Sequence, residues 1–396
     1  MKIGFFLDQS FPPDSRVENE AYSLIKAGHE VHLFSLDYEN RKPAKEEING
    51  IHVYRYSAGK LTYKLSALAY TNGWFKGLIS KKIKAFIEAV KPDVLHVHDM
   101  VIAESVMDVN DSDYNKPLVL DLHENRPEIM QFYPHLKKFP GKQLIRIGKW
   151  RKKQSELIKR ADHVILVTKE AIKVAAFETN LPMGKFTDVA NTVEPDIYWN
   201  YALDKEIILK FKKGFDIVYV GDTGLRRGTD TAIDAIKLLI NKIPEIQLVL
   251  VGKSTEDEIL KRKVFELGLT SNVLFEGWKD VSNFPSYIEG AEVCISPLHR
   301  NKHHDTTFAN KLFQYMAGER AVIVSNCDAQ ANVVKETDCG LVFEAGNAKA
   351  LADCLLDLYK NPHRAKEYGM NGKKAVVDKY NWKETSKGLI ALYEGL

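Results

Sequence analysis

The sequence lacks long hydrophobic runs, strong net charge and any cysteine motif, and each absence excludes a class of protein. No uninterrupted apolar stretch has the ~20 residues that a membrane-spanning helix needs. The 56 Lys and Arg residues nearly balance 53 Asp and Glu residues, for a net charge of +3, which gives no general argument for nucleic acid. The cysteines show neither CxxC nor Cys/His metal spacing, so they are expected to be buried, reduced thiols. They are Cys294, Cys327, Cys339 and Cys354.

The amino terminus also lacks a signal peptide. The apolar run that follows Met1 is too short for one and ends at Asp8, so it is interpreted as a first strand. The expected location is therefore the cytoplasm, or the inner face of the cell membrane as a peripheral protein. Repeats and low-complexity segments are absent as well.

What the sequence does contain is a regular alternation of strands and helices. Apolar strand patterns occur at 1–8, 31–36, 51–56, 94–98, 117–124 and 161–168, and again at 215–222, 247–252, 273–277, 293–296 and 321–325. Ser15 and Glu18 match a capping box that opens a helix ending at Gly28. This alternation of strands and helices predicts two doubly wound, mostly parallel sheets. The two halves of the chain meet near residues 192–214.

The predicted domains are a first Rossmann-like domain over residues 1–195, a second over 196–375, and a final helical segment over 376–396. The chain from Ala348 onward is expected to be helical, with breaks at Asn361-Pro362 and at Tyr380 to Trp382. A chain of 396 residues exceeds one ordinary core, and its 45% apolar content is enough for two. Ligands of such sheets bind beyond the carboxyl ends of the strands. Two such domains facing each other would therefore share a central cleft.

The segment from Asn310 to Gly318 shows the clearest chemical pattern. Leu312, Phe313 and Met316 have helical spacing, Gly318 ends the helix, and a Val/Ile run follows as a buried strand. A helix that begins near the edge of a parallel sheet is a suitable place for a phosphate or a sugar hydroxyl.

Several motifs together resemble the family 4 retaining glycosyltransferases, which have the GT-B fold of two Rossmann-like domains. The similar segments are Gly28 to Val31, Pro92 to His98, Asn191 to Glu194, Gly221 to Gly228, Gly340 to Phe343 and Tyr380 to Trp382. The likeness covers essentially the whole chain. It implies transfer of a hexose from a nucleotide sugar with retained anomeric configuration, without a metal or cofactor. The second domain would hold the donor, the first the acceptor, and the last helix would cross back to the first domain.

The sequence departs from the family pattern at two acidic positions. The family's paired glutamates fall at Thr306 and Gln314, so the donor would be held there by neutral hydrogen bonds. The family's arginine after the strand glycine falls at Asp222. In the first domain, Asp14, Ser15 and Arg16 replace the family's Gly-Gly loop.

Two arginines are the expected diphosphate ligands. Arg226 and Arg227 lie in a glycine-bordered loop before a helix, where guanidinium groups could bind both oxygens of a diphosphate. Arg227 matches the position of the family lysine. The alternative is a solvated basic turn.

The segment from Thr306 to Gln314 contains the other expected donor ligands. Lys311 is expected on a donor phosphate or hydroxyl, because a cation opposes the dipole at a helix start and needs another reason to be there. The remaining donor residues of this segment are Thr306, Thr307, Phe308, Ala309, Asn310, Leu312 and Gln314. His303 and His304 precede it. They could suggest a metal, but without a third spaced ligand they favour a polar loop.

His123 follows a strand and resembles the family histidine that touches the donor sugar, although a structural role is the alternative. His96 and His98 alternate on a strand, so at most one is expected to face the cleft. Asp99 and Glu124 are expected on the acceptor side, together with the Asp14 to Arg16 loop.

Two further residues are candidate nucleotide contacts. Trp278 could stack on the base, although a tryptophan beside a strand is more often part of the core. Lys253 follows a strand glycine and is a second candidate.

A basic segment at 137–153 interleaves lysines and arginines with Phe139, Leu144 and Trp150. It could rest on anionic lipid near a lipid-linked acceptor, or form an ordinary surface helix. No motif for reading nucleic acid bases accompanies it.

The sequence thus predicts a glycosyltransferase that uses a UDP- or GDP-sugar to build a cell-surface polysaccharide or glycolipid. Two alternatives remain: a GT-B nucleotide-sugar epimerase or phosphorylase, and a nucleotide-sugar-binding protein without catalytic activity.

Overall fold

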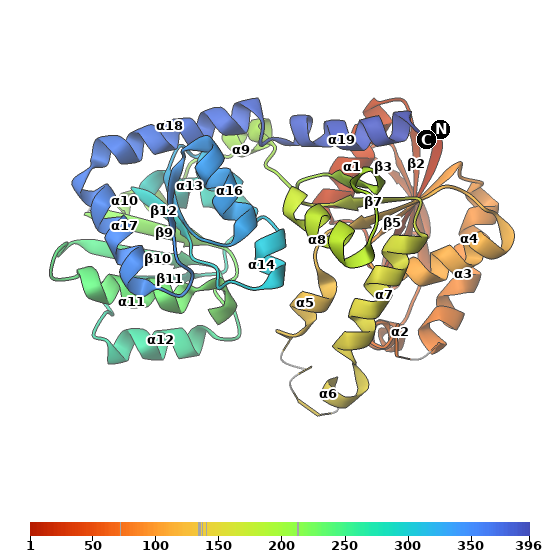
Figure 1. The fold of residues 1–396 in the computed structure, drawn as a ribbon, viewed down its shortest axis with the longest axis horizontal. Helices are drawn as coiled ribbons and strands as arrows, with labels where there is room; N and C mark the ends of the chain where they lie inside the picture. Colours follow the sequence, from red (N-terminus) through yellow and green to blue (C-terminus); the bar gives the residue numbers. More distant parts are fainter. Residues whose placement is uncertain (72, 134–135, 137, 140, 212–213) are drawn as a thin grey trace. The chain divides into compact units, whose positions relative to one another are not determined.

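The computed structural model describes residues 1–71, 73–133, 136, 138–139, 141–211 and 214–396 (Figure 1). It divides into two compact units. The first comprises Met1–Ala190 and Ser386–Leu396, and the second comprises Asn191–Thr385. The last residues of the chain therefore belong to the unit that holds the first.

The first unit is built on a sheet with the strand order β3-β4-β2-β1-β5-β6-β7-β8. All neighbours pair in parallel except β3 and β4, which are antiparallel. The strands are β1 (Lys2–Leu7), β2 (Glu30–Asp37), β3 (Lys45–Ile48), β4 (Ile51–Ser57), β5 (Val94–His98), β6 (Leu118–Leu122), β7 (His163–Leu166) and β8 (Phe186–Asp188). The sequence analysis missed the two edge strands, because β3 is short and polar and β8 has only three residues.

The helices of the first unit cover both faces of this sheet. Leu95 and Val97 of β5 face a core that includes Ile83, Met107 and Leu157 from α3, α4 and α7. The opposite face of β5 carries His96 and His98, and His96 contacts Glu20 of α1 and Tyr393 of α19. The helices are α1 (Ser15–Lys26), α2 (Lys60–Ser66), α3 (Trp74–Val90), α4 (Ala103–Asp113), α5 (Arg126–Met130), α6 (Gly141–Leu144), α7 (Ile147–Arg160), α8 (Lys169–Thr179) and the end of α19 (Trp382–Glu394).

The capping box of α1 lies one residue earlier than predicted. Asp14 is the N-cap, and its side chain accepts a hydrogen bond from the amide of Val17 at 3.1 Å. Glu18 accepts one from the Asp14 amide at 3.2 Å. The aspartate is the stronger cap at this position, because its carboxylate also favours the positive end of the helix.

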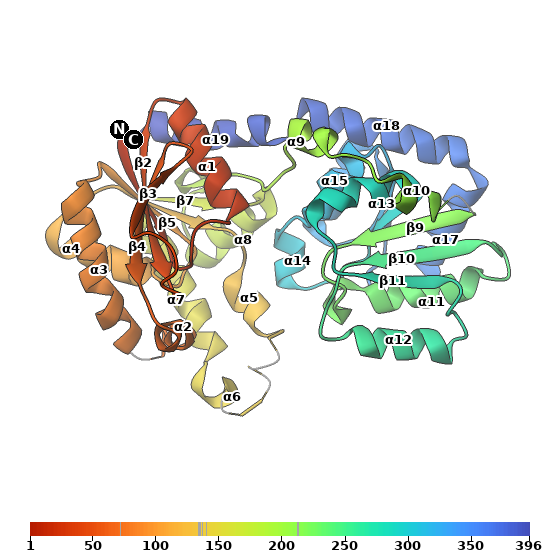
Figure 2. The same cartoon turned by 180° about the vertical axis from the view of Figure 1, so that it is seen from behind.

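The second unit is a parallel sheet with the order β11-β10-β9-β12-β13-β14. Its strands are β9 (Phe215–Val220), β10 (Ile246–Val251), β11 (Val273–Gly277), β12 (Val293–Ser296), β13 (Ala321–Ser325) and β14 (Gly340–Phe343). Alternate residues of β9 face different cores: Ile217 packs with residues of α11, α12 and α17, and Val218 with residues of α13, α15 and α16. Figure 2 shows α11 and α12 on one side of the sheet and α13 and α15 on the other.

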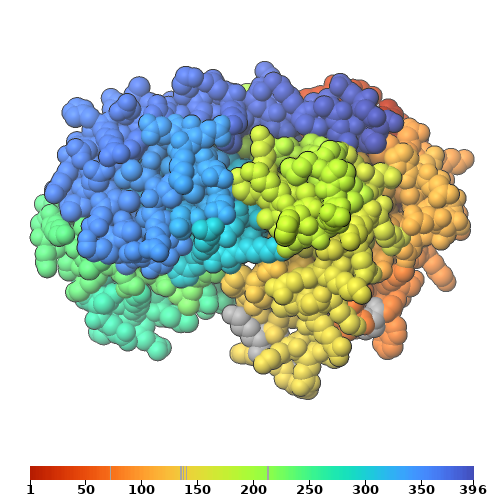
Figure 3. All heavy atoms as spheres, in the orientation of Figure 1, coloured from red at the N-terminus to blue at the C-terminus, as the bar shows by residue number. Residues whose placement is uncertain are grey.

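The helices of this unit are separated near its end at the two predicted breaks. They are α9 (Pro195–Asn200), α10 (Lys205–Leu209), α11 (Thr229–Leu239), α12 (Asp257–Glu266), α13 (Phe284–Gly290), α14 (Lys302–Thr306), α15 (Lys311–Ala317), α16 (Asp328–Thr337), α17 (Ala348–Lys360) and α18 (Pro362–Asp378). Side chains of α16 to α18 form much of the surface of this unit in Figure 3. The cysteines carry free thiols, three of them buried and Cys354 half-buried.

Candidate functional site

The candidate donor site lies at the carboxyl end of β9 in the second unit. Gly221 ends the strand at φ 107°, and Gly252 ends the neighbouring strand at φ 148°. A Cβ atom on Gly252 would lie 1.8 Å from the Gly221 carbonyl oxygen, so only glycine allows this approach. The space beside Gly221 is entered by the side chain of Lys311.

Asp222 forms ion pairs with both arginines that the sequence predicts as diphosphate ligands. Its Oδ2 lies 3.0 Å from Arg226 Nη2 and 3.3 Å from Arg227 Nε. Burial alone would raise the pKa of Asp222, but the Gly224 amide and both arginines outweigh it and hold the pKa below its usual value. One carboxylate thus pairs with two guanidinium groups, so these three side chains together carry a net positive charge. The sequence analysis had noted Asp222 only as a departure from the family pattern.

Lys311 is the most unusual residue of the site. Its side chain is buried, and Nζ lies 3.4 Å from the ring centroid of Tyr219 and 3.3 Å from where a Cβ on Gly221 would be. Among the described residues, Nζ has no hydrogen-bond partner. Burial first and the charge of Arg227 second hold the pKa of Lys311 well below its usual value. A buried ammonium donor without an acceptor is arranged to receive an anion.

His303 and His304 are not in a polar loop, contrary to the prediction. They lie buried in the short helix α14, which Asn301 caps by accepting a hydrogen bond from the His304 amide at 3.0 Å. Burial lowers the pKa of each histidine to about 3, so both are neutral. Each has one ring nitrogen without a partner in the described part of the chain. They form neutral, polar lining beside the cations.

The segment between α14 and α15 divides into exposed and buried residues. Thr306 is buried, and its hydroxyl donates to the Lys302 carbonyl at 2.7 Å. The side chain of Leu312 lies in the hydrophobic core, so it cannot reach a ligand there. Thr307, Phe308 and Gln314 are half-buried, Ala309 is buried and Asn310 is exposed. Gln314 and Asn310 are therefore the accessible polar side chains of this segment.

The two candidate nucleotide contacts are both on the surface. Trp278 follows β11 and is 72% exposed, so it is not the core residue that the alternative interpretation described. Lys253 follows β10 and is also exposed. Lys253 follows β10, which is next to β9 in the sheet, and Trp278 follows β11, which lies one strand farther from β9.

The first unit contains a buried ion network that the sequence analysis only partly anticipated. Arg16 Nη2 lies 2.8 Å from Asp121 Oδ1 and 3.0 Å from Glu20 Oε1. Arg16 also donates to the Val189 carbonyl at 2.9 Å. Burial raises the pKa of Glu20, assisted by the charge of Asp121. Arg16 was predicted on the acceptor side, but its guanidinium is committed to this network.

His123 connects the network to the surface. Its Nε2 lies 2.7 Å from Asp121 Oδ2, while Nδ1 lies 3.6 Å from Asp99 Oδ2, too far for a hydrogen bond. Although burial lowers its pKa, Asp121 and Asp99 outweigh burial and raise it to about 9. The ring is therefore positively charged at neutral pH. Its side chain is 18% exposed, so Nδ1–H can still donate to a ligand.

His96 and His98 share one face of β5 because they are two residues apart, and both are fully buried. Glu20, His96, His98 and Asp121 could by position hold a metal ion. Arg16 and His123 already supply the positive charge that the carboxylates need. Among the described residues, both Glu20 carboxylate oxygens, His96 Nε2 and His98 Nε2 have no hydrogen-bond partner.

The remaining acceptor-side predictions lie at loop positions of the first unit. Asp14 is occupied as the cap of α1, Ser15 is exposed and Glu124 is half-buried. Asp99 has φ 58° and accepts a hydrogen bond from the His123 amide at 3.2 Å. Sequence reasoning missed Asp8 at the end of β1. Burial raises the pKa of Asp8 to about 6, against the charge of Arg126. Its position directly after a buried strand was the available signal.

The two units define a class of protein. Each is a doubly wound sheet with polar residues at the carboxyl ends of its strands, and this pair of domains is the GT-B fold of glycosyltransferases. Sucrose-phosphate synthase from Thermosynechococcus elongatus is similar over 100% of this chain and 98% of its own, with a TM-score of 0.77 and 17% identity. HepE of Anabaena, solved with UDP, is similar over 100% of both chains, with a TM-score of 0.75 and 14% identity.

Sequence comparisons identify the family. The model for "Glycosyltransferase Family 4" matches residues 15–197, and the model for "Glycosyl transferases group 1" matches residues 201–375. This chain belongs to family 4 of the glycosyltransferases. It is 24% identical to a phosphatidyl-myo-inositol mannosyltransferase of Mycolicibacterium smegmatis, over 100% of this chain and 94% of that protein. The corresponding protein of Mycobacterium leprae is 26% identical over 43% of each chain.

No helix among the described residues is both long and apolar enough to cross a membrane.

Proposed function

We propose that this glycosyltransferase moves a hexose from a UDP- or GDP-sugar, with retained anomeric configuration, to a saccharide or lipid-linked saccharide that becomes part of the cell surface. The observation that carries the donor assignment is Lys311, a buried ammonium group without an acceptor beside two arginines. A diphosphate satisfies all three cations at once. The UDP and UDP-glucose complexes of HepE and the mannosyltransferase relative agree with this class of substrate.

In the proposed reaction the glycosidic bond to the diphosphate breaks, and negative charge develops on the departing oxygen. Arg227, Arg226 and Lys311 stabilise this charge, and cations fixed in advance lower the barrier more than they strengthen ground-state binding. An oxygen of the departing diphosphate takes the acceptor's proton on the same face of the sugar. The route needs no protein nucleophile, no metal and no cofactor.

In this proposal Asn310 and Gln314 of the second unit hold the sugar, and the Nδ1–H of His123 is the hydrogen-bond donor that the first unit offers to a substrate. A charged imidazole is the stronger hydrogen-bond donor, and Asp121 keeps it charged. Gln314 offers both an amide donor and a carbonyl acceptor to hydroxyls where the family has a glutamate.

The experiment is turnover of a panel of UDP- and GDP-sugars by wild type and Arg227→Ala. The variant is expected to lose kcat by about 100-fold while donor affinity falls much less. Equal losses in both would contradict the charge-stabilising role. Retention is checked by NMR of the product's anomeric proton, and metal independence by turnover in excess EDTA.

A thermal-shift assay with the same panel, together with nucleotide release, separates the alternatives. An epimerase or phosphorylase would convert the donor without an acceptor or with free phosphate, and a binding protein would shift the melting temperature without releasing nucleotide.

Anionic lipid is the proposed partner surface, which would place the enzyme at the inner face of the membrane. In the basic segment, Lys142, Arg146 and Lys149 are exposed and form no ion pair with another described residue. They lie next to Phe139 at 80% exposure and Leu144 at 49%. Lys137 lies outside the described residues. Farther along α7, Arg151 and Lys153 pair with Glu128 and Glu104, as in an ordinary surface helix. The proposal therefore concerns residues 139–149.

A further inference from the structure

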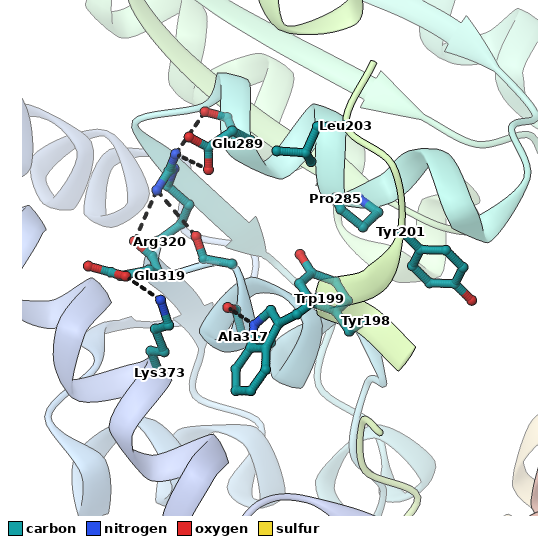
Figure 4. A pocket seen from close by; sticks show the side chains of 11 residues that line it. Tyr198, Trp199, Tyr201, Leu203, Pro285, Glu289, Ala317, Glu319, Arg320 and Lys373 are labelled. Carbon is teal, nitrogen blue, oxygen red and sulfur yellow. Dashed lines mark hydrogen bonds and ion pairs between the residues drawn. The ribbon is translucent and has the colours of Figure 1, made fainter. Parts of the chain in front are cut away.

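A second pocket lies in the second unit, away from the donor site. It has a volume of about 370 Å³, within the ~300–1,000 Å³ usual for ligand pockets. Its lining includes Gly318, Glu319 and Arg320, which directly precede β13 (Figure 4). In a parallel sheet the strand starts and strand ends form opposite edges. The pocket is thus at the amino edge, and the cations of the donor site are at the carboxyl edge.

One side of the pocket is aromatic. Tyr198, Trp199 and Tyr201 come from a single segment at the end of α9. The Trp199 ring is 43% exposed, and its Nε1 donates to the Ala317 carbonyl at 3.0 Å (Figure 4). Because that bond uses the only polar atom of the ring, the indole is held in place and offers the pocket an apolar surface.

The other side carries two ion pairs whose charges cancel. Arg320 Nη2 lies 2.9 Å from Glu289 Oε2, and Lys373 Nζ lies 2.9 Å from Glu319 Oε2 (Figure 4). Arg320 also donates to the carbonyls of Gly318 and Glu319, which fixes its plane. The two carboxylates are 48% and 36% exposed, so they keep lone pairs for a ligand. A balanced set of acceptors and donors suits hydroxyl groups rather than an ion.

The pocket also contains a polar atom that lacks a partner. Tyr198 is 6% exposed, and its hydroxyl has no hydrogen-bond partner among the described residues. It lies beside Gly318, where a Cβ would come within 2.9 Å of the hydroxyl oxygen. A buried hydroxyl without a partner is costly, and a ligand or water in the pocket would satisfy it.

We infer that this pocket binds a neutral oligosaccharide. The apolar face of a sugar ring stacks on Trp199, and its hydroxyls bind Glu289, Glu319 and Tyr198. The absence of net charge in the lining argues against a nucleotide or a phosphate. The occupant is therefore a glycan chain held away from the site of transfer, and not the donor. This inference rests on the pocket alone and does not depend on the proposed donor chemistry.

The test is saturation-transfer-difference NMR of the whole protein with neutral trisaccharides: maltotriose, cellotriose, chitotriose and mannotriose. At least one should bind, with a dissociation constant raised tenfold or more by Trp199→Ala. Leu203→Trp places a bulky side chain at the pocket lining, where Leu203 is 51% exposed, and should block binding without disturbing the core. Trp74→Ala, which removes a 73% exposed tryptophan of the first unit, is the matched control and should bind as wild type does.

Two outcomes would overturn the inference: no trisaccharide binds, or binding survives both pocket variants. Nucleotide-sugar binding in a parallel thermal-shift assay separates this failure from that of the proposed function. Both pocket variants should keep the donor-induced shift, because they leave Arg226, Arg227 and Lys311 unchanged.

Discussion

At the scale of single residues, the donor site is distinguished by an excess of cations over carboxylates in a buried place. Asp222 is shared between Arg226 and Arg227, and Lys311 has no acceptor. In the free protein, burial and the neighbouring cations disfavour the charged form of Lys311, which lowers its pKa. An anion that binds there stabilises the protonated form of Lys311 and so raises its pKa.

Proton uptake on donor binding is the first prediction at this scale. Because the pKa of Lys311 is lowered in the free protein and rises beside a diphosphate, donor affinity should fall as pH rises between the two pKa values. Titration calorimetry with UDP-sugar in buffers of different ionisation enthalpy should detect the proton.

The matched variant is Lys311→Met, which keeps the length and apolar character of the side chain. It should bind the donor more weakly and without proton uptake. The same uptake in the variant would assign the proton to another group.

The stability that His123 contributes should depend on pH. Its pKa is about 9 in the folded protein and about 6.5 when unfolded, so the stabilisation is complete below about pH 6.5 and lost as pH rises through 9. The shift corresponds to roughly 3 kcal/mol as an order of magnitude. Urea unfolding of wild type and His123→Gln at pH 6, 8 and 10 measures it.

The difference between the two proteins should be largest at pH 6 and nearly vanish at pH 10. Replacement of the exposed His363 by Gln is the control and should change stability equally at all three values. A constant difference for His123→Gln would show that its charge is not what stabilises the unit.

At the scale of elements, the sequence predicted the buried strands and the long helices, because apolar periodicity reports burial. The β5 prediction coincides with Val94–His98, and the breaks at Asn361 and Tyr380 separate α17, α18 and α19 as expected. Short elements were missed. The α14 helix has five residues and depends on the Asn301 cap and on burial of His303 and His304, neither of which a periodicity can report.

The candidate site was also predictable only in part from the sequence. Arg226, Arg227 and Lys311 could be proposed from their places beside glycines and a helix start, and the structure brings them together around Asp222 and Tyr219. The network around Asp121 could not be foreseen, because Arg16 and Asp121 are 105 positions apart and nothing local pairs them.

Membrane binding by residues 139–149 is a prediction about one element. The described residues of this segment are Phe139 and 141–149, and α6 among them lies at the surface of the first unit (Figure 3). Each exposed cation near an anionic bilayer contributes about 1 kcal/mol, so reversal of Lys142, Arg146 and Lys149 to Glu should weaken binding by at least about tenfold. Flotation with vesicles containing phosphatidylglycerol measures this.

The control reverses three exposed lysines of the second unit, Lys205, Lys335 and Lys360, for the same change in net charge. If both triple variants lose binding equally, the attraction is a property of the total charge and not of this segment.

At the scale of the whole molecule, the chain returns at its end to the unit in which it began. Ser386–Leu396 belongs to the first unit, and Tyr393 is fully buried there. The Tyr393 hydroxyl lies 2.7 Å from His96 Nδ1, and His96 Nε2 lies 3.4 Å from Glu20. The ion network that holds His123 therefore reaches the last helix of the chain. The first unit therefore includes residues that follow the second unit in the sequence.

Tyr393→Phe tests this connection, because it removes only the hydroxyl group that contacts His96. It leaves a buried histidine nitrogen without its partner, so the free energy of unfolding should fall by about 1–3 kcal/mol. Hydrogen exchange should locate the loss in β5 and β6, which carry His96 and Asp121. Tyr359→Phe, at a 40% exposed tyrosine of the second unit, is the control and should leave both strands protected. Unchanged exchange in β5 in Tyr393→Phe would mean that α19 packs on the first unit through its apolar contacts alone.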